Sequence, residues 1–120
     1  MTRINCVPPE ELSREHLLAE YRELPRVFNL AAKAYQSNRK VVAPERYTLG
    51  AGHVKFFYRR LGWCLDRFLA LRLEMLVRGY KPQYVQPPPV NLPPEWWGEW
   101  TPDAAAMQLN RDRISERKTA

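Results

Sequence analysis

The sequence predicts an all-α protein: a single compact domain of three main helices, with an extended N-terminal arm and a Pro/Trp-rich connecting segment. Three observations predict this class. Two long stretches carry apolar residues at spacings of three and four, the period of a helix with one buried face. A helix-start pattern lies near the end of the chain. No stretch has the strand–helix–strand pattern of an α/β protein, and 120 residues suit one domain, placed at 1–120.

The first helix is expected to follow an extended arm of residues 1–9. Pro9 and the acidic residues Glu10 and Glu11 suit a first helical turn. Pro25 lacks the amide hydrogen that would bond the carbonyl of Tyr21, so we expect a local bend there. The residues that form the apolar stripe of this helix are Leu17, Tyr21, Leu24, Phe28, Ala31 and Tyr35.

A second helix is expected from about Val54 to Arg78, after a polar loop at 37–47 and a glycine-containing turn at 49–53. Gly79 suits its C-terminal end, where glycine readily takes a left-handed conformation. The stripe of this helix consists of Phe57, Leu61, Cys64, Phe68, Leu71 and Met75. Both stripes predict that the two helices share one core.

The C-terminal part combines an extended segment with a short helix. Residues 81–100 are rich in proline and aromatic residues, so we expect the segment to lie over the helices, with its indoles filling gaps in the core. Thr101, Pro102 and Asp103 predict a helix start, with the Thr101 hydroxyl as the cap. The last helix is expected from Pro102 to about Lys118.

The composition narrows the classes of function that the protein can have. The formal net charge of +6 favours a polyanionic partner such as nucleic acid. Cys6 and Cys64 are expected to be buried thiols of a reduced, cytoplasmic protein. No apolar run is long enough to span a membrane, and the first residues do not form a secretion signal. His16 and His53 lack the neighbours of a metal site and are expected to be structural, so we expect no metal.

One face of the first helix carries a cluster of charges. Glu15, Arg22 and Arg26 are separated by seven and four residues, and Glu23 lies beside them. One interpretation is a solvated face with intrahelical ion pairs, each contributing about 0.2–0.5 kcal/mol. The other is a carboxylate held beside two guanidinium groups, which suits DNA phosphates and a cationic reaction intermediate.

Three segments resemble the bacteriophage endonuclease V family, which comprises pyrimidine-dimer DNA glycosylases with apurinic/apyrimidinic lyase activity. They are Met1–Asn5, the thirteen-residue run His16–Phe28, and Leu49–Val54. Helix amphipathicity alone does not produce a run of such mixed polarity, so the first two segments together are specific. The resemblance implies base-excision repair of ultraviolet damage in double-stranded DNA, without a cofactor, and we expect a monomer.

The resemblance also implies roles for individual residues. Thr2, exposed by loss of Met1, would supply the α-amine that attacks the sugar carbon bearing the damaged base. Its small side chain usually permits that removal. Glu23 would be the catalytic carboxylate, stabilising the imine (Schiff base) intermediate and assisting β-elimination. The residues implied to lie at or near the DNA are Arg3, Glu15, His16, Arg22, Arg26, Arg113 and Arg117.

Because the sequence departs from the family pattern in two places, the kind of DNA damage that the protein recognises stays open. Glu15 stands where the phage enzyme has a glutamine placed for DNA contact, and its carboxylate would repel phosphate or pair with Arg22 or Arg26. The chain also lacks the aromatic, basic tail that helps the phage enzyme to recognise the dimer. Alternatives are therefore the same chemistry on another damaged base or on abasic sites only, a non-catalytic DNA-binding domain, and an N-terminal threonine hydrolase.

Overall fold

A computed structural model describes residues 4–38 and 42–119, with side chains up to residue 116. Its three α-helices are α1 (Arg14–Gln36), α2 (Leu61–Val77) and α3 (Ala104–Thr119). Three short 3-10 turns accompany them, η1 (Pro9–Glu11), η2 (Lys55–Phe57) and η3 (Pro94–Trp96), and no β-strand occurs in the described ranges. The prediction of an all-α fold with three main helices is confirmed.

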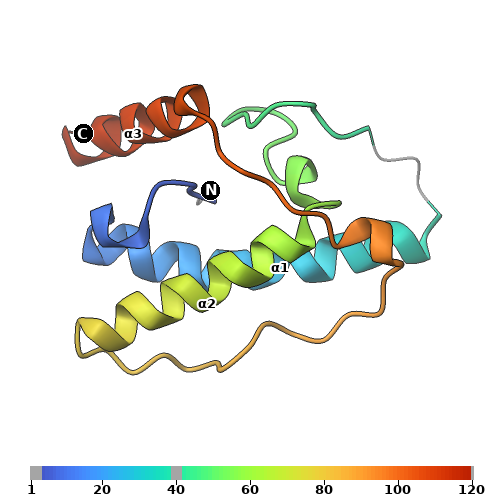
Figure 1. Ribbon diagram of the computed structural model, residues 1–120, viewed down its shortest axis with the longest axis horizontal. Coiled ribbons are helices and arrows are strands. Elements are labelled where there is room, and N and C mark those ends of the chain that lie inside the picture. Colours follow the sequence, from blue (N-terminus) through green and yellow to red (C-terminus); the bar gives the residue numbers. More distant parts are fainter. Residues whose placement is uncertain (1–3, 39–41, 120) are drawn as a thin grey trace.

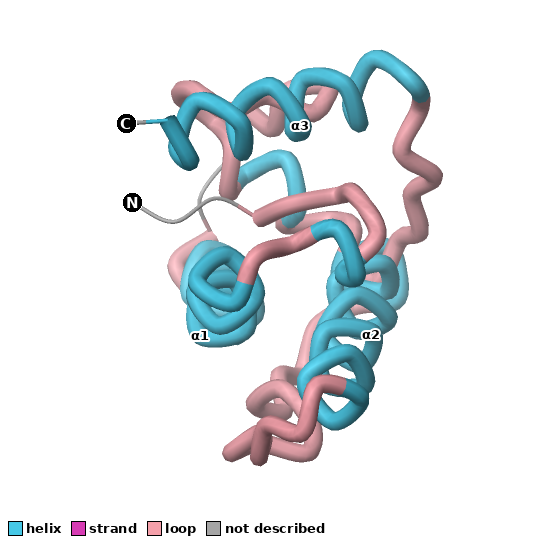
Figure 2. The backbone as a smooth tube through the Cα atoms, turned by 90° about the vertical axis from the view of Figure 1, so that its left-hand side faces the viewer, coloured by secondary structure: helices cyan, strands magenta, loops and turns pink. Residues whose placement is uncertain are grey.

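The helices form two layers with the N-terminal arm between them. α1 and α2 lie side by side, and α3 lies over them (Figures 1 and 2). The arm runs through the space between α3 and the α1–α2 layer, and the proline-rich segment that follows α2 passes along the side away from α3 (Figure 1). None of the helices described is long and apolar enough to cross a membrane.

α1 begins later than the sequence predicted. Pro9–Glu11 form the separate turn η1, and Leu12 then takes an extended, buried conformation that ends it. Ser13 caps α1, its Oγ accepting a hydrogen bond from the amide of His16 at 3.3 Å. The helix continues through Pro25 to Gln36. Five of its six stripe residues are buried, whereas Tyr35 at the far end is 46% exposed.

The predicted second helix is interrupted, because Gly98 forms hydrogen bonds with both backbone groups of one helical hydrogen bond. In a continuous helix the Trp63 amide would donate to the Arg59 carbonyl. Instead, the Gly98 amide donates to that carbonyl at 3.2 Å, and the Trp63 amide donates to the Gly98 carbonyl at 3.1 Å. A Cβ at Gly98 would lie 2.5 Å from the Arg59 oxygen, so only glycine fits. α2 therefore begins at Leu61, after η2.

The remaining boundary predictions are partly confirmed. All six stripe residues of the second helix are buried. Gly79 ends α2 with φ +85, and the Tyr80 amide bonds the Met75 carbonyl at 2.8 Å. The cap predicted for the last helix was wrong: Asp103 accepts the Ala106 amide at 2.7 Å, so Asp103, not Thr101, caps α3. Its carboxylate outcompetes the more distant hydroxyl because it lies one residue before the helix.

The aromatic residues of the connecting segment pack as predicted. Trp96 is buried, and Trp100 stacks on Tyr47 with ring centroids 5.6 Å apart. The same indole meets Phe56 and Trp63 edge to face, each at 5.0 Å. This cluster lies where the chain passes from η2 into α2, so it fixes the 47–53 turn against the core.

Candidate active site and the anchored N-terminal arm

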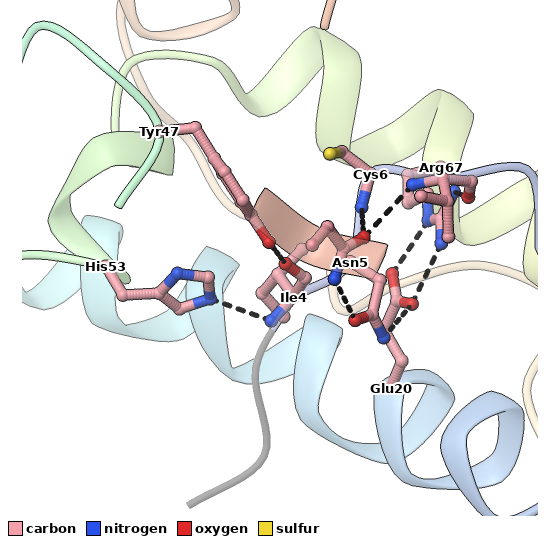
Figure 3. A network of polar contacts seen from close by, with 9 residues as sticks. Ile4, Asn5, Cys6, Glu20, Tyr47, His53 and Arg67 are labelled. Carbon is pink, nitrogen blue, oxygen red and sulfur yellow. Dashed lines mark hydrogen bonds and ion pairs between the residues drawn. The ribbon is translucent and has the colours of Figure 1, made fainter. Parts of the chain in front are cut away.

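The arm, residues Ile4–Val7, is buried throughout and is held first by the 47–53 turn. The Ile4 amide donates to His53 Nε2 at 2.8 Å, and the Ile4 carbonyl accepts from the Tyr47 hydroxyl at 2.8 Å (Figure 3). His53 Nδ1 lies 2.6 Å from the Thr48 carbonyl. A carbonyl only accepts, so Nδ1 carries the hydrogen and Nε2 is the acceptor for Ile4. The structural role predicted for His53 is confirmed.

A buried ion pair holds the next residue of the arm. Asn5 Nδ2 donates to Glu20 Oε1 at 2.9 Å (Figure 3). Arg67 of α2 donates to the same carboxylate through Nε at 2.7 Å and Nη2 at 2.9 Å, and through Nη1 to the Val7 carbonyl. Burial lowers the pKa of Arg67, but attraction and hydrogen bonding from Glu20 outweigh it and the pKa is raised. The charges therefore remain paired inside the protein.

α3 completes the enclosure of the arm through Asn110. Its Oδ1 accepts the Cys6 amide at 2.7 Å and the Val7 amide at 3.2 Å. Its Nδ2 donates to Asn5 Oδ1 at 2.7 Å. The arm is thus hydrogen-bonded to all three helices and to the 47–53 turn.

The charged face of α1 lies one turn from this network. Glu23 follows Glu20 by three residues, which is about 4.5 Å along the helix axis. The Glu23 carboxylate is 18% exposed and accepts Arg26 Nη1 at 3.0 Å and 3.3 Å. Arg26 itself is 62% exposed, and Arg22 is exposed too. The face therefore presents one carboxylate oriented by Arg26, and the side chain of Arg22 on the same face is exposed.

An open hollow of about 450 Å³ lies beside the C-terminal half of α1. Leu30, one turn beyond Arg26, lines the hollow together with Tyr58 of the chain that follows η2. The rest of its wall is the turn and η2 start at 50–55, where Gly52 has φ +87. The turn that anchors Ile4 through His53 therefore also borders this hollow, together with Leu30 of α1.

Several predicted site residues can be placed and others cannot. Glu15 is exposed, and the ion pair with Arg22 or Arg26 that the sequence left open does not form among the described residues. Arg26 pairs with Glu23 instead, which is closer in helical spacing. His16 Nδ1 lies 2.7 Å from Ser13 Oγ at the start of α1. Their roles in DNA contact stay predictions.

Arg113 is the predicted DNA residue of α3 whose side chain the structure describes. Its Nη1 lies 3.9 Å from Glu116 Oε2, and its Nε has no hydrogen-bond partner in the described part of the chain. Thr2 and Arg3 lie outside the described residues, as does the side chain of Arg117.

Sequence reasoning missed the polar network that holds the arm. For two residues of this network, the sequence contains an indication: each is a charged residue on an apolar stripe. Glu20 lies between Leu17 and Tyr21 on the stripe of α1. Arg67 lies beside Phe68 on the stripe of α2. A charge at a core-facing position is rarely tolerated without a partner of opposite charge. Asn5 and Asn110 carried no comparable signal.

The described residues contain no group of three His, Cys, Asp or Glu side chains that could hold a metal ion. In a comparison with protein families, residues 1–85 match the sequence model of one family, described as pyrimidine dimer DNA glycosylase. The matched range contains the arm, α1, the 47–53 turn and α2. It does not include η3 or α3.

Proposed function

Because the chain belongs to the pyrimidine-dimer DNA glycosylase family, its substrate is damaged DNA, and we propose that it is bifunctional. After removing the damaged base, it cleaves the strand as an apurinic/apyrimidinic lyase, using the α-amine of Thr2 as nucleophile. The observation that supports the proposal is the anchoring of the arm: Ile4 is bound by His53, and Asn5 is bound by Glu20 of α1, one turn from Glu23. An extended chain spans at most about 3.3–3.6 Å per residue, so Thr2, three residues before Asn5, has the reach for this face.

An N-terminal amine suits the first step better than a lysine does. An unperturbed α-amine has a pKa of about 7.7–8.0, so a useful fraction is neutral near neutral pH, whereas lysine is almost entirely protonated. Nearby guanidinium groups disfavour protonation further. Arg22 and Arg26 would serve this purpose in addition to holding phosphates.

The first chemical step exchanges one bond at the sugar for another. The amine nitrogen bonds to C1′ as the bond from C1′ to the base nitrogen breaks, and the electron pair leaves with the base. The base takes up one proton and the amine gives one up. The nitrogen lone pair then opens the sugar ring, with O4′ receiving a proton, and an iminium ion forms.

Strand cleavage follows by β-elimination from this iminium ion. A base removes a proton from C2′, the electron pair moves toward C3′, and the C3′–O3′ bond breaks, releasing the phosphate end. Water then hydrolyses the imine and restores the amine. Glu23 fits both demands: its carboxylate stabilises the cation and accepts the C2′ proton. Its hydrogen bonds to Arg26 support the assignment because they orient it on a rigid helix.

Borohydride trapping tests the proposal. Borohydride reduces an iminium ion to a stable amine, so an enzyme–DNA imine becomes a covalent complex. We expect trapping with duplexes that carry a pyrimidine dimer and with abasic duplexes, and none with undamaged DNA. Trapping on abasic duplexes alone would support the abasic-site alternative. Absence of trapping on every duplex would overturn the lyase mechanism.

Two variants assign the roles. Glu23→Gln should abolish strand cleavage while duplex binding persists, and Thr2→Pro should slow trapping because the nucleophile becomes a secondary amine. Glu45→Gln, an exposed substitution of the same chemistry in the loop before the 47–53 turn, is the control and should remain fully active. Full activity of Glu23→Gln would show that another group is the carboxylate. Mass spectrometry of the active protein should show Thr2 as its first residue.

A further inference from the structure

Asn110 is a buried polar residue of α3, and its side-chain hydrogen bonds within the described residues go to the arm. Its side chain is 0% exposed. Oδ1 receives the amides of Cys6 and Val7, and Nδ2 donates to Asn5. α3 lies outside the residues that match the family model. The arm therefore depends on a segment that the family match does not include.

Asn110 supplies the hydrogen-bond acceptor that a neighbouring strand would otherwise provide to the arm. No strand flanks the arm in the described structure, so the amides of Cys6 and Val7 have no ladder partner. Both residues are buried, and a buried amide without an acceptor is strongly unfavourable. A single carboxamide oxygen with two lone pairs accepts both. The register of the arm against α3 is thereby fixed.

The same side chain sets the orientation of Asn5. A carboxylate only accepts, so Glu20 requires the Asn5 Nδ2 group to face α1. Asn5 Oδ1 must then face α3, where Asn110 Nδ2 meets it. Any shift of the arm along its own axis would break bonds on both sides together. Asn5 is consequently held between α1 and α3, three residues from Thr2.

We propose that Asn110 is a positioning residue for the reactive amine, an inference that rests on the function proposed above. It acts through Asn5, Cys6 and Val7, and it touches neither the DNA nor the reacting atoms. α3 thus completes the active site from outside residues 1–85, which match the family model. A displacement of about 1 Å at a reacting group can slow a reaction about 100-fold, so the bonds of Asn110 should matter more for the attack than for DNA affinity.

The test compares Asn110→Asp with Gln108→Ala. Aspartate has the shape of asparagine and keeps an acceptor for the two amides, but it replaces the donor to Asn5 by a second oxygen. Gln108 lies on the exposed side of α3, two residues away, and serves as the control. The probes are an abasic duplex for single-turnover borohydride trapping and a duplex with a tetrahydrofuran residue, which binds without forming an imine. Thermal denaturation verifies that each variant is folded.

We expect Asn110→Asp to form the trapped complex about 10- to 100-fold more slowly than the parent. Its affinity for the tetrahydrofuran duplex and its elimination rate after imine formation should change less than about twofold. Gln108→Ala should match the parent throughout. Trapping of Asn110→Asp at the parent rate would overturn the inference and leave the proposed function intact. An equal loss in affinity and trapping would also overturn it. A parent that never traps would contradict the proposed function itself.

Discussion

At the scale of single residues, the buried Glu20–Arg67 pair holds the arm at Asn5 and Val7. Both side chains are buried, and removing one partner leaves an unpaired charge inside the protein. We expect Glu20→Gln, which keeps the shape, to lower the free energy of unfolding by about 3–5 kcal/mol. Urea denaturation measures this. Glu45→Gln, at an exposed position, should change it by less than about 0.5 kcal/mol. A loss below about 1 kcal/mol for Glu20→Gln would show that the buried charge is compensated elsewhere.

Glu15 allows a prediction about DNA affinity. It is exposed, lies on the helix face of Arg22, and is in no ion pair among the described residues. Its charge would repel phosphate, so Glu15→Gln should tighten duplex binding about two- to fivefold, as an exposed charge contributes about 0.5–1 kcal/mol. Fluorescence anisotropy at two salt concentrations measures this, and the gain should shrink at the higher one. Unchanged affinity would indicate that Glu15 lies away from the DNA.

The two cysteines should be inert in the folded protein. Burial raises the pKa of the Cys6 thiol to about 12 and that of Cys64 still further, so neither forms a thiolate near neutral pH. We expect a thiol-specific alkylating reagent to leave native protein unmodified and to label both cysteines in urea. Labelling without denaturant would contradict their burial.

At the scale of elements, η1 and α3 are joined by a pair of hydrogen bonds. Arg111 Nε and Nη2 donate to the Glu11 carboxylate at 2.9 Å and 2.8 Å. Hydrogen bonding from Arg111 lowers the pKa of Glu11 below its ordinary value of 4.5. The folded state therefore favours the charged carboxylate. Its stabilisation is present above the ordinary pKa and is lost as the pH falls through the lowered one.

This pair should contribute to acid sensitivity. Between about pH 5 and about pH 3, the melting temperature of the parent should fall more steeply than that of Glu11→Gln, which cannot titrate. Circular dichroism measures both curves. Parallel curves would show that the pair contributes nothing to the docking of α3.

The elements also show what the sequence could predict. The two buried stripes and the Gly79 end followed from local periodicity and helix-end chemistry, which depend on near neighbours. The start of α2 could not be predicted from near neighbours, because it is set by Gly98, more than thirty residues further along the chain. The cap of α3 was misassigned between two residues that both favour helix starts.

The candidate site, too, could be predicted from the sequence only in part. The shared face of Glu15, Arg22 and Arg26, with Glu23 beside it, followed from their spacing, and their roles came from the resemblance. The polar network of the arm was missed because its bonds join residues between 15 and 105 positions apart. No local pattern encodes such pairs. Only Glu20 and Arg67, charged residues on apolar stripes, gave a usable sign.

At the scale of the whole molecule, the net charge of +6 predicts salt-sensitive binding. Each phosphate neutralised lowers the slope of log affinity against log salt concentration by about 0.9. Arg22→Gln should therefore make the slope about one unit shallower. Arg111→Gln removes the same charge, but Arg111 is paired with Glu11, so its slope should match the parent. Equal slopes for all three proteins would place Arg22 outside the DNA interface.

The long reach of the arm's hydrogen bonds has a consequence during synthesis. Ile4 binds a residue 49 positions later, and Cys6 binds one 104 positions later. The ribosome must therefore release nearly the whole polypeptide before the first residues it made can settle in the interior. Until then the leading end of the nascent chain has no place to dock and stays open to the aminopeptidase that removes initiator methionine. Under the mechanism proposed above, the amine of Thr2 would therefore be exposed early in synthesis and positioned late, once α3 has been made.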